Sequence, residues 1–220
     1  MNAEETLDWL RARRSVRSFT PEPVGRSLLE RLFEAAICAP SSTNRQPWRF
    51  ACVTAPSRRE KLVEAVRRRC DEMKAIIRRG HHADDFGSYG DFFWEPLASA
   101  AAIVVPQYRA YPDLIANLIA SGGGNPADYE TAGSMQAELC STAAAVMNLL
   151  NQAHAERLGA CWMAGPMVAR RDIEAELGIA EPWRMVGAVA IGWPSPTPPG
   201  PKPPRKPIDK VVVWFEESPE

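Results

Sequence analysis

The sequence predicts an α+β domain, and three observations support this class. Segments with apolar residues at three- and four-residue spacing, typical of amphipathic helices, occur throughout the 220 residues. Short apolar runs lie between them, and we expect strands near 48–54, 101–106, 185–192 and 211–215. No internal repeat and no linker divides the chain. Residues 1–220 are therefore expected to form one domain with a sizeable core.

The N-terminal part predicts two helices. Asn2 and Glu5 have the spacing of a capping box, so a first helix is expected to start there and to end around Arg14. We expect its apolar residues, Leu7, Leu10 and Trp9, to lie on a buried side. Residues 28–37 show helical spacing after a proline-marked turn, and Pro40 stops this second helix.

The middle of the chain predicts strands and helices around an aromatic-rich stretch. A strand over 48–53 precedes an amphipathic third helix, for which Ser57 is the expected cap. Residues 80–96 contain few helix formers and several aromatic residues. We interpret them either as a lid or substrate wall, or as packing against the neighbouring helix. A buried strand over 101–105 and a short helix over 108–119 follow.

The C-terminal half begins with the longest predicted helix, over 131–155, in which small residues allow close helix approach. Gly165 and Pro166 predict a sharp turn that presents backbone N–H groups. A helix over 170–177 closes at Gly178, a typical C-cap, and residues 185–192 form the clearest buried strand.

A proline-rich arm ends the chain. Eight of the fourteen residues from 194 to 207 are proline, which excludes helix and central sheet. We expect residues 194–220 to form an extended arm that ends in a strand over 211–215. An arm of this length could place that strand on the sheet of a partner subunit.

Charge and composition exclude several classes of function. The net charge of −1 gives no field that would attract nucleic acid or an anionic membrane, and the arginine runs at 67–69 and 78–79 are interpreted as a solvated helix face. The acidic N-terminus lacks a signal-peptide pattern, and no apolar run approaches the ~20 residues of a membrane span. We expect a cytoplasmic protein.

Cysteine and histidine spacing predicts no metal site and no disulfide framework. The five cysteines are scattered and odd in number, and they lack the spacing of zinc ligands. The adjacent His81 and His82 would diverge on a helix and face opposite sides on a strand. The glycines at 122–124 lack the flanking residues of a phosphate-binding loop, so we assign them no nucleotide role.

Two polar clusters carry the functional signal. Arg13, Ser15 and Arg17 occupy alternate positions, so on an extended segment their side chains leave the backbone on one side. Paired guanidinium groups suit an anion with several oxygens, such as a phosphate. The second cluster, residues 39–48, is a polar loop between a helix and a strand, where a scaffold presents hydrogen-bonding groups to a ligand.

Together the two clusters resemble the FMN-dependent nitroreductase family. That family has an Arg-x-Ser-x-Arg/Lys-x-Phe segment after its first helix and a Pro-Ser-Ser-x-Asn-x-Gln-Pro-Trp loop after its second; here they are residues 13–19 and 40–48. The resemblance implies a three-layer sandwich, a mostly antiparallel sheet flanked by helices. It also implies a homodimer that exchanges C-terminal arms and holds FMN at its interface. The helix over 131–155 would form the dimer core; an ordinary buried helix remains the alternative.

The resemblance also implies roles for individual residues. The phosphate and ribityl chain of FMN would be held by Arg13 and Ser15, with Arg14 contributing in part, through its backbone. Arg17 would lie near flavin N1 and stabilise negative charge there. The remaining implied contacts are Pro40, Ser41, Ser42 and Asn44 to the ring from the partner subunit, the backbone of Ala164 and Gly165 to N5 and O4, and Lys202 and Arg205 to the phosphate. Ser42 capping a turn and Lys202 pointing into water remain alternatives.

The implied activity is a ping-pong oxidoreduction. NADH or NADPH would reduce FMN, and a small-molecule acceptor such as a nitroaromatic or a quinone would reoxidise it, with no side chain acting as an acid–base catalyst. The alternatives are a dehalogenase, a small-molecule dehydrogenase, an enzyme that cleaves its own reduced flavin with oxygen, or a flavin carrier or sensor. No ribose-reading motif distinguishes NADH from NADPH. Residues 80–130, which shape the substrate pocket in the family, contain no matching motif.

Overall fold

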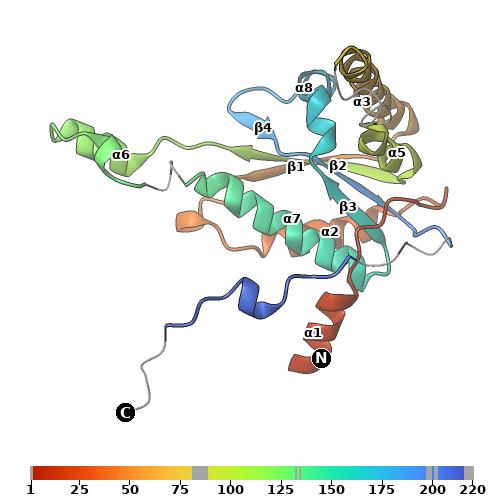
Figure 1. Ribbon diagram of the computed structural model, residues 1–220, viewed down its shortest axis with the longest axis horizontal. Helices are drawn as coiled ribbons and strands as arrows, with labels where there is room; N and C mark the ends of the chain where they lie inside the picture. The colour runs from red at the N-terminus through yellow and green to blue at the C-terminus, as the bar shows by residue number, and fades with distance from the viewer. Residues whose placement is uncertain are drawn as a thin grey trace.

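The computed structural model describes residues 2–80, 89–131, 133, 135–196, 200 and 203–215. A five-stranded antiparallel sheet forms the middle of the molecule (Figure 1). Its main path runs in the order β1 (Trp48–Val53), β2 (Ala102–Arg109), β5 (Ala188–Gly192) and β3 (Gly159–Met163), and β4 (Trp183–Met185) also pairs with β2. The predicted α+β class with an antiparallel sheet is confirmed.

Helices cover both faces of the sheet. The helices on one face are α2 (Arg26–Ile37) and α7 (Ala137–Ala155); those on the other are α3 (Pro56–Ile77), α5 (Asp91–Ser99) and α8 (Arg170–Leu177) (Figure 1). The side chains of β2 alternate between the two cores. Val104 packs with Leu32 and Leu149 on the α2/α7 side, whereas Ile103 packs with Leu62 on the other.

Local capping signals predicted the helix ends well in two places. Asn2 Oδ1 accepts the Glu5 N–H at 2.9 Å and the Asn2 N–H donates to Glu5 Oε2 at 2.8 Å, so α1 (Ala3–Ala12) starts with the expected capping box. Gly178 ends α8 with a φ of +64°. The cap assigned to Ser57 is wrong: α3 starts at Pro56, because proline has the φ of a first helical residue and no N–H to satisfy.

Several predicted strand boundaries are corrected. The helix expected over 108–119 instead begins as the end of β2, and α6 (Leu114–Ser121) starts only where Asp113 caps it. The strand expected over 185–192 is interrupted, since Gly187 has a φ of +107° between β4 and β5. The short strand β3 was not predicted. Helix α5 occupies part of the aromatic-rich stretch, where few helix formers were noted. Helix α7 begins at Ala137, six residues after the start expected at position 131.

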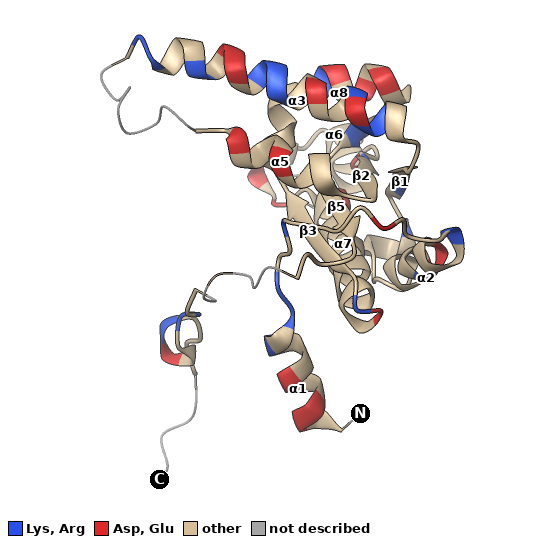
Figure 2. Cartoon of the chain, turned by 90° about the vertical axis from the view of Figure 1, so that its right-hand side faces the viewer, with Lys and Arg blue, Asp and Glu red and all other residues tan. Residues whose placement is uncertain are grey.

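Neither α1 nor residues 203–215 of the arm contain a buried residue, although the Trp9 ring of α1 lies 5.2 Å from the His154 ring of α7. Residues 211–215 form no strand in the described structure, so that prediction is wrong for a single subunit; an arm that leaves the body reaches no sheet edge of its own. Val213, Trp214 and Phe215 are 76%, 68% and 95% exposed. The α1 helix buries no residue, contrary to expectation. Both segments extend from the same side of the body (Figures 1 and 2).

Candidate functional site

The segment that follows α1 is extended and lies against the ends of β3 and β5. The Val16 N–H donates to the Ala160 carbonyl at 3.1 Å, and the Thr20 N–H donates to the Trp193 carbonyl at 2.9 Å. Phe19 forms an isolated antiparallel bridge with Pro194. These backbone contacts fix the segment from residue 13 to residue 20, which carries the first polar cluster.

Two glycines let this segment approach the sheet closely. Gly159 and Gly192 are partners in the β3–β5 register. A Cβ on Gly159 would lie 2.7 Å from Val16 Cγ1, and one on Gly192 would lie 3.0 Å from Phe19. Any larger residue at either position would push the segment outward.

Arg13, Ser15 and Arg17 lie near Cys161 of β3 and line one cavity. Burial raises the pKa of the Cys161 thiol, while the charge of Arg17, a hydrogen bond with Ser15 and the charge of Arg13 each oppose this rise. The alternate positions therefore bring two guanidinium groups and a hydroxyl together.

A cavity of about 750 Å³ opens beside this cluster. Such a volume is typical of sites for cofactors and other small molecules. Its lining residues come from the segment after α1, the end of α7 and the start of the arm: Ala12, Arg13, Arg14, Ser15, Val16, Arg17, Ser18, Leu150, His154, Arg157, Leu158, Ala160, Pro194, Ser195, Gly200 and Pro203. These residues include four guanidinium groups and no carboxylate, so they suit a phosphate group.

Three predicted phosphate ligands, Arg14, Lys202 and Arg205, lie on the arm or contact it, and their positions differ. Arg14 Nη2 donates to the Gly200 carbonyl at 2.8 Å, so its side chain holds the arm. Arg205 is exposed and is not among the residues that line the cavity. Lys202 lies outside the described residues.

The second cluster forms a tight loop that starts with a 3₁₀ turn at Ser42–Asn44. The Gln46 N–H donates to Ser41 Oγ at 3.0 Å, and the Ser42 N–H donates to Ser141 Oγ of α7 at 3.3 Å. Thr43, Asn44 and Gln46 have φ values of +50°, +53° and +47°. The left-handed conformation costs a non-glycine residue about 1–2 kcal/mol, and such strain concentrates at binding sites. Pro40, which precedes the loop, is exposed.

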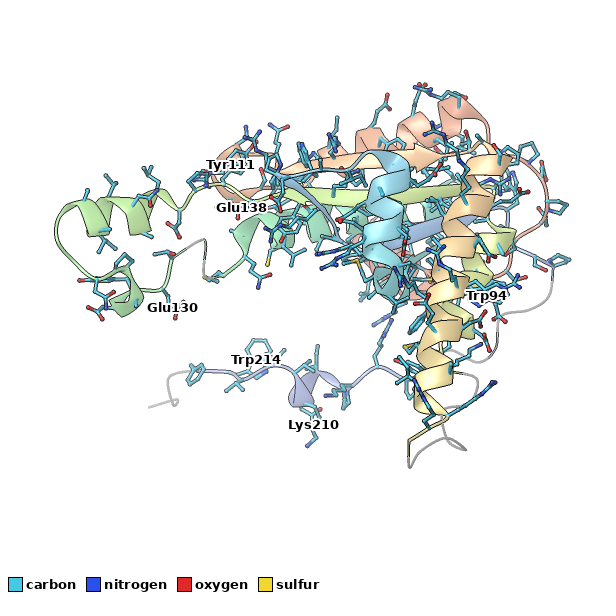
Figure 3. The ribbon with its side chains drawn as sticks, turned by 90° about the horizontal axis from the view of Figure 1, so that it is seen from above. Trp94, Tyr111, Glu130, Glu138, Lys210 and Trp214 are labelled. Atoms are coloured by element: carbon cyan, nitrogen blue, oxygen red, sulfur yellow. The ribbon has the colours of Figure 1, made fainter. Side chains whose placement is uncertain are left out.

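An ion pair fixes this loop to α7. Arg45 Nη1 lies 3.0 Å from Glu138 Oε1, whose side chain is only 9% exposed. The guanidinium carbon of Arg45 also lies 5.3 Å from the centre of the Tyr111 ring, and that of Arg109 lies 5.1 Å from it. Tyr111 and Glu138 lie close together in Figure 3. No local sequence pattern links Arg45 with Tyr111 and Glu138, because they are far apart in the chain.

The two polar clusters do not meet within one subunit. The loop contacts Ser141 near the start of α7, whereas the cavity contacts His154 near its end. At 1.5 Å per residue these positions are about 20 Å apart. A single ligand could therefore contact both clusters only if one of them came from a second subunit.

Ala164 and Gly165 follow β3 and begin a short 3₁₀ helix, Gly165–Ala169. Gly165 packs directly on the ring of Phe93 in α5, since an added Cβ would lie 2.2 Å from Phe93 Cδ1. Phe93 forms edge-to-face contacts with Tyr89 and Phe92, which are 39% and 51% exposed. Within the aromatic-rich stretch, Phe93 thus packs internally while its two neighbours face solvent.

Neither a membrane span nor a metal cluster is found in the described part of the chain. None of its helices has both the length and the apolar character needed to cross a bilayer. No group of three or more His, Cys, Asp and Glu side chains in that part is arranged to hold a metal ion.

Comparisons with known proteins agree with this architecture. The chain is 28% identical over 182 residues to the 5,6-dimethylbenzimidazole synthase of Rhodospirillum rubrum, a match that covers 83% of this chain and 78% of that protein. A shorter match, 44% identical over 54 residues, relates it to an NADH dehydrogenase of Thermus thermophilus and spans about a quarter of each protein.

Solved structures share the fold. A BluB-like flavoprotein from Clostridium difficile superimposes with a TM-score of 0.83 at 20% identity, covering 96% of this chain and 99% of that one. A nitroreductase from Desulfovibrio desulfuricans in complex with FMN gives a TM-score of 0.66 at 22% identity and 99% coverage of both chains. The model of the nitroreductase family matches residues 10–193. The chain therefore belongs to the nitroreductase family.

Proposed function

We propose that the protein is an FMN-dependent oxidoreductase that takes electrons from NADH or NADPH and passes them to a small acceptor. The observation that carries this proposal is the cavity lined by Arg13, Ser15 and Arg17, next to Cys161 of β3. Its cationic lining suits the phosphate of FMN. The FMN complex of the Desulfovibrio relative and the Thermus relative described as an NADH dehydrogenase support the cofactor and the donor.

The chain's residues would bind and orient the cofactor rather than exchange protons with substrate. Arg13 and Ser15 would hold the phosphate and ribityl chain, and Arg17 would provide positive charge near the ring. The flavin supplies the hydride chemistry when it is bound. Ala164 and Gly165 would contact its reactive edge through their backbone, and Gly165 is held in place by Phe93. The exposed Phe92 and Tyr89 next to Phe93 favour flat aromatic acceptors, such as nitroaromatics or quinones.

We also propose a homodimer whose two sites each use both subunits. This arrangement accounts for the separation of the clusters along α7, because a partner would bring Pro40, Ser41, Ser42 and Asn44 to the cavity. The unburied α1 and the exposed apolar arm support an exchange of C-terminal segments. Figure 3 shows Trp214 far from the sheet of its own chain. The outer edge of β1 pairs with no described strand and is available to a partner's arm.

The free thiols found in the described structure favour a cytoplasmic location.

Subunit mixing tests this arrangement. An Arg17→Glu chain lacks one half of each site and an Asn44→Arg chain blocks the other half, so each homodimer should lack NAD(P)H oxidation activity. If sites are shared, a mixed dimer contains one intact site, and co-refolding equal amounts should restore about a quarter of the wild-type activity. Mixtures that remain as inactive as the separate variants would contradict a shared site.

A second candidate is cleavage of the chain's own reduced flavin with oxygen. The match to the Rhodospirillum synthase covers most of both proteins, and the BluB-like flavoprotein has a high TM-score. A dimethylbenzimidazole contains the dimethyl-substituted ring of the flavin skeleton and the two nitrogens bonded to adjacent carbons of that ring. Incubation of the protein with excess FMN, NADPH and oxygen, followed by mass analysis, separates the candidates. Release of dimethylbenzimidazole would establish cleavage, and reoxidation with recovery of intact FMN would exclude it.

A further inference from the structure

We propose that Arg157, at the C-terminal end of α7, is an additional ligand for the flavin phosphate. This inference rests on the proposed function and adds a residue that neither polar cluster contains. Arg157 lines the same cavity as Arg13, Arg14 and Arg17. Its guanidinium group has no hydrogen bond and no ion pair with any other described residue. A cation in a cavity whose described lining residues include no carboxylate is therefore available to an anionic ligand.

The backbone of Arg157 supports a role for its side chain. The φ of Arg157 is +59°, in the left-handed region. Its N–H donates to the His154 carbonyl at 3.1 Å, and the N–H of Leu158 donates to the Ala153 carbonyl at 2.8 Å. These two bonds define a Schellman motif, in which glycine normally occupies the position of Arg157. The arginine here destabilises the free protein, so a compensating gain is expected elsewhere.

A structural explanation competes with this proposal. A cation near the last turn of a helix interacts favourably with the carbonyl end of the helix dipole. That role would make Arg157 stabilising in the absence of flavin, and its effect would be the same for every flavin. If Arg157 instead binds the phosphate, its substitution should weaken the binding of FMN and not that of riboflavin. Riboflavin has the same ring and ribityl chain as FMN but no phosphate.

The test compares FMN with riboflavin in the full-length protein after removal of bound flavin. Affinities are measured by quenching of flavin fluorescence, and melting temperatures are measured without flavin. Arg157→Gly should weaken FMN binding by about tenfold, the loss expected for one exposed charge-assisted contact, and leave riboflavin binding within twofold. It should also raise the melting temperature by a few degrees, because glycine relaxes the left-handed backbone.

Two further variants separate charge from backbone. Arg157→Lys should retain most of the FMN affinity, since it keeps the charge. Gln136→Gly is the matched backbone control: Gln136 has a φ of +51° at the other end of α7 and does not line the cavity. It should raise the melting temperature and leave the ratio of the two flavin affinities unchanged.

Two results would overturn the proposal while leaving the proposed function intact. One is an unchanged ratio of FMN to riboflavin affinity in Arg157→Gly. The other is equal weakening of both flavins together with a lower melting temperature, which would assign Arg157 to the helix end alone. A wild-type protein that binds neither flavin would overturn the proposed function and this proposal together.

Discussion

Substitution of Gly159 by alanine should displace the segment that carries the arginine cluster. The added Cβ would lie 2.7 Å from Val16 Cγ1, 2.9 Å from Val16 Cβ and 3.0 Å from Phe19 Cε1. Carbon atoms normally approach to about 3.5 Å, so Val16 must move by about 0.8 Å. Val16 lies between Ser15 and Arg17, and its N–H donates to the Ala160 carbonyl. The movement therefore directly affects Ser15 and Arg17, the side chains proposed to bind the flavin.

The expected cost follows from this overlap. Overpacking of this kind costs about 1–3 kcal/mol of unfolding free energy, which lowers the melting temperature of a chain of this size by about 2–4 °C per kcal/mol. Displacement of a binding group by nearly 1 Å should also weaken FMN binding, by about tenfold. Thermal melts and fluorescence titrations measure the two effects separately.

A second substitution tests the physical cause. Val16→Gly removes both Val16 atoms, Cγ1 and Cβ, that the added Cβ would approach within 3.0 Å. Gly159→Ala combined with Val16→Gly should therefore be more stable than the sum of the two single effects predicts, by about 1 kcal/mol. Gly122→Ala is the control, because its φ is −82° and its nearest neighbours are at ordinary contact distance, 3.5 Å. If Gly159→Ala behaves like Gly122→Ala, or if the double variant is simply additive, the close-approach argument is refuted.

Three further predictions concern charge, pH and assembly. Arg17→Ala should slow flavin reduction more than it weakens FMN binding, and equal losses in stopped-flow and titration experiments would count against an electrostatic role. A hydrogen bond from Arg69 lowers the pKa of Asp172 in the folded protein. The ionised carboxylate therefore stabilises the fold above the unfolded pKa of about 3.9, and this stabilisation is lost as the pH falls through the lower folded pKa. Melting temperatures of Asp172→Asn should therefore be lower than wild type at neutral pH and converge with it in acid; parallel curves would refute the linkage. If the protein forms the proposed dimer, Trp214→Ser with Phe215→Ser should shift it to monomer in sedimentation experiments, and an unchanged dimer would exclude these side chains from the interface.

The features that the sequence predicted correctly depend on local signals. The capping box of Asn2 and Glu5 and the glycine stop at Gly178 each involve residues a few positions apart. The strand expected over 101–106 was also found as β2, because it is a continuous apolar run. In contrast, β3 contains only five residues, and the break at Gly187 depends on a backbone conformation that composition does not reveal.

The candidate site was predictable only in part, for a related reason. Arg13, Ser15 and Arg17 line one cavity, and the neighbouring Arg14 and Ser18 line it too. The association of Arg45 with Glu138 and the position of Arg157 in the cavity depend on how α7 packs, so no local pattern identifies them. The strand expected over 211–215 requires a sheet edge, and the arm leads away from the sheet of its own chain.

The most direct test of the central claim is the visible absorption spectrum of the purified protein, recorded without oxygen before and after addition of NADH or NADPH. We predict a yellow protein whose flavin band bleaches with at least one donor. That result would establish a flavin reductase and identify its electron source. A colourless protein that also fails to take up added FMN would contradict the account, because the arginine-lined cavity would then have no flavin to bind.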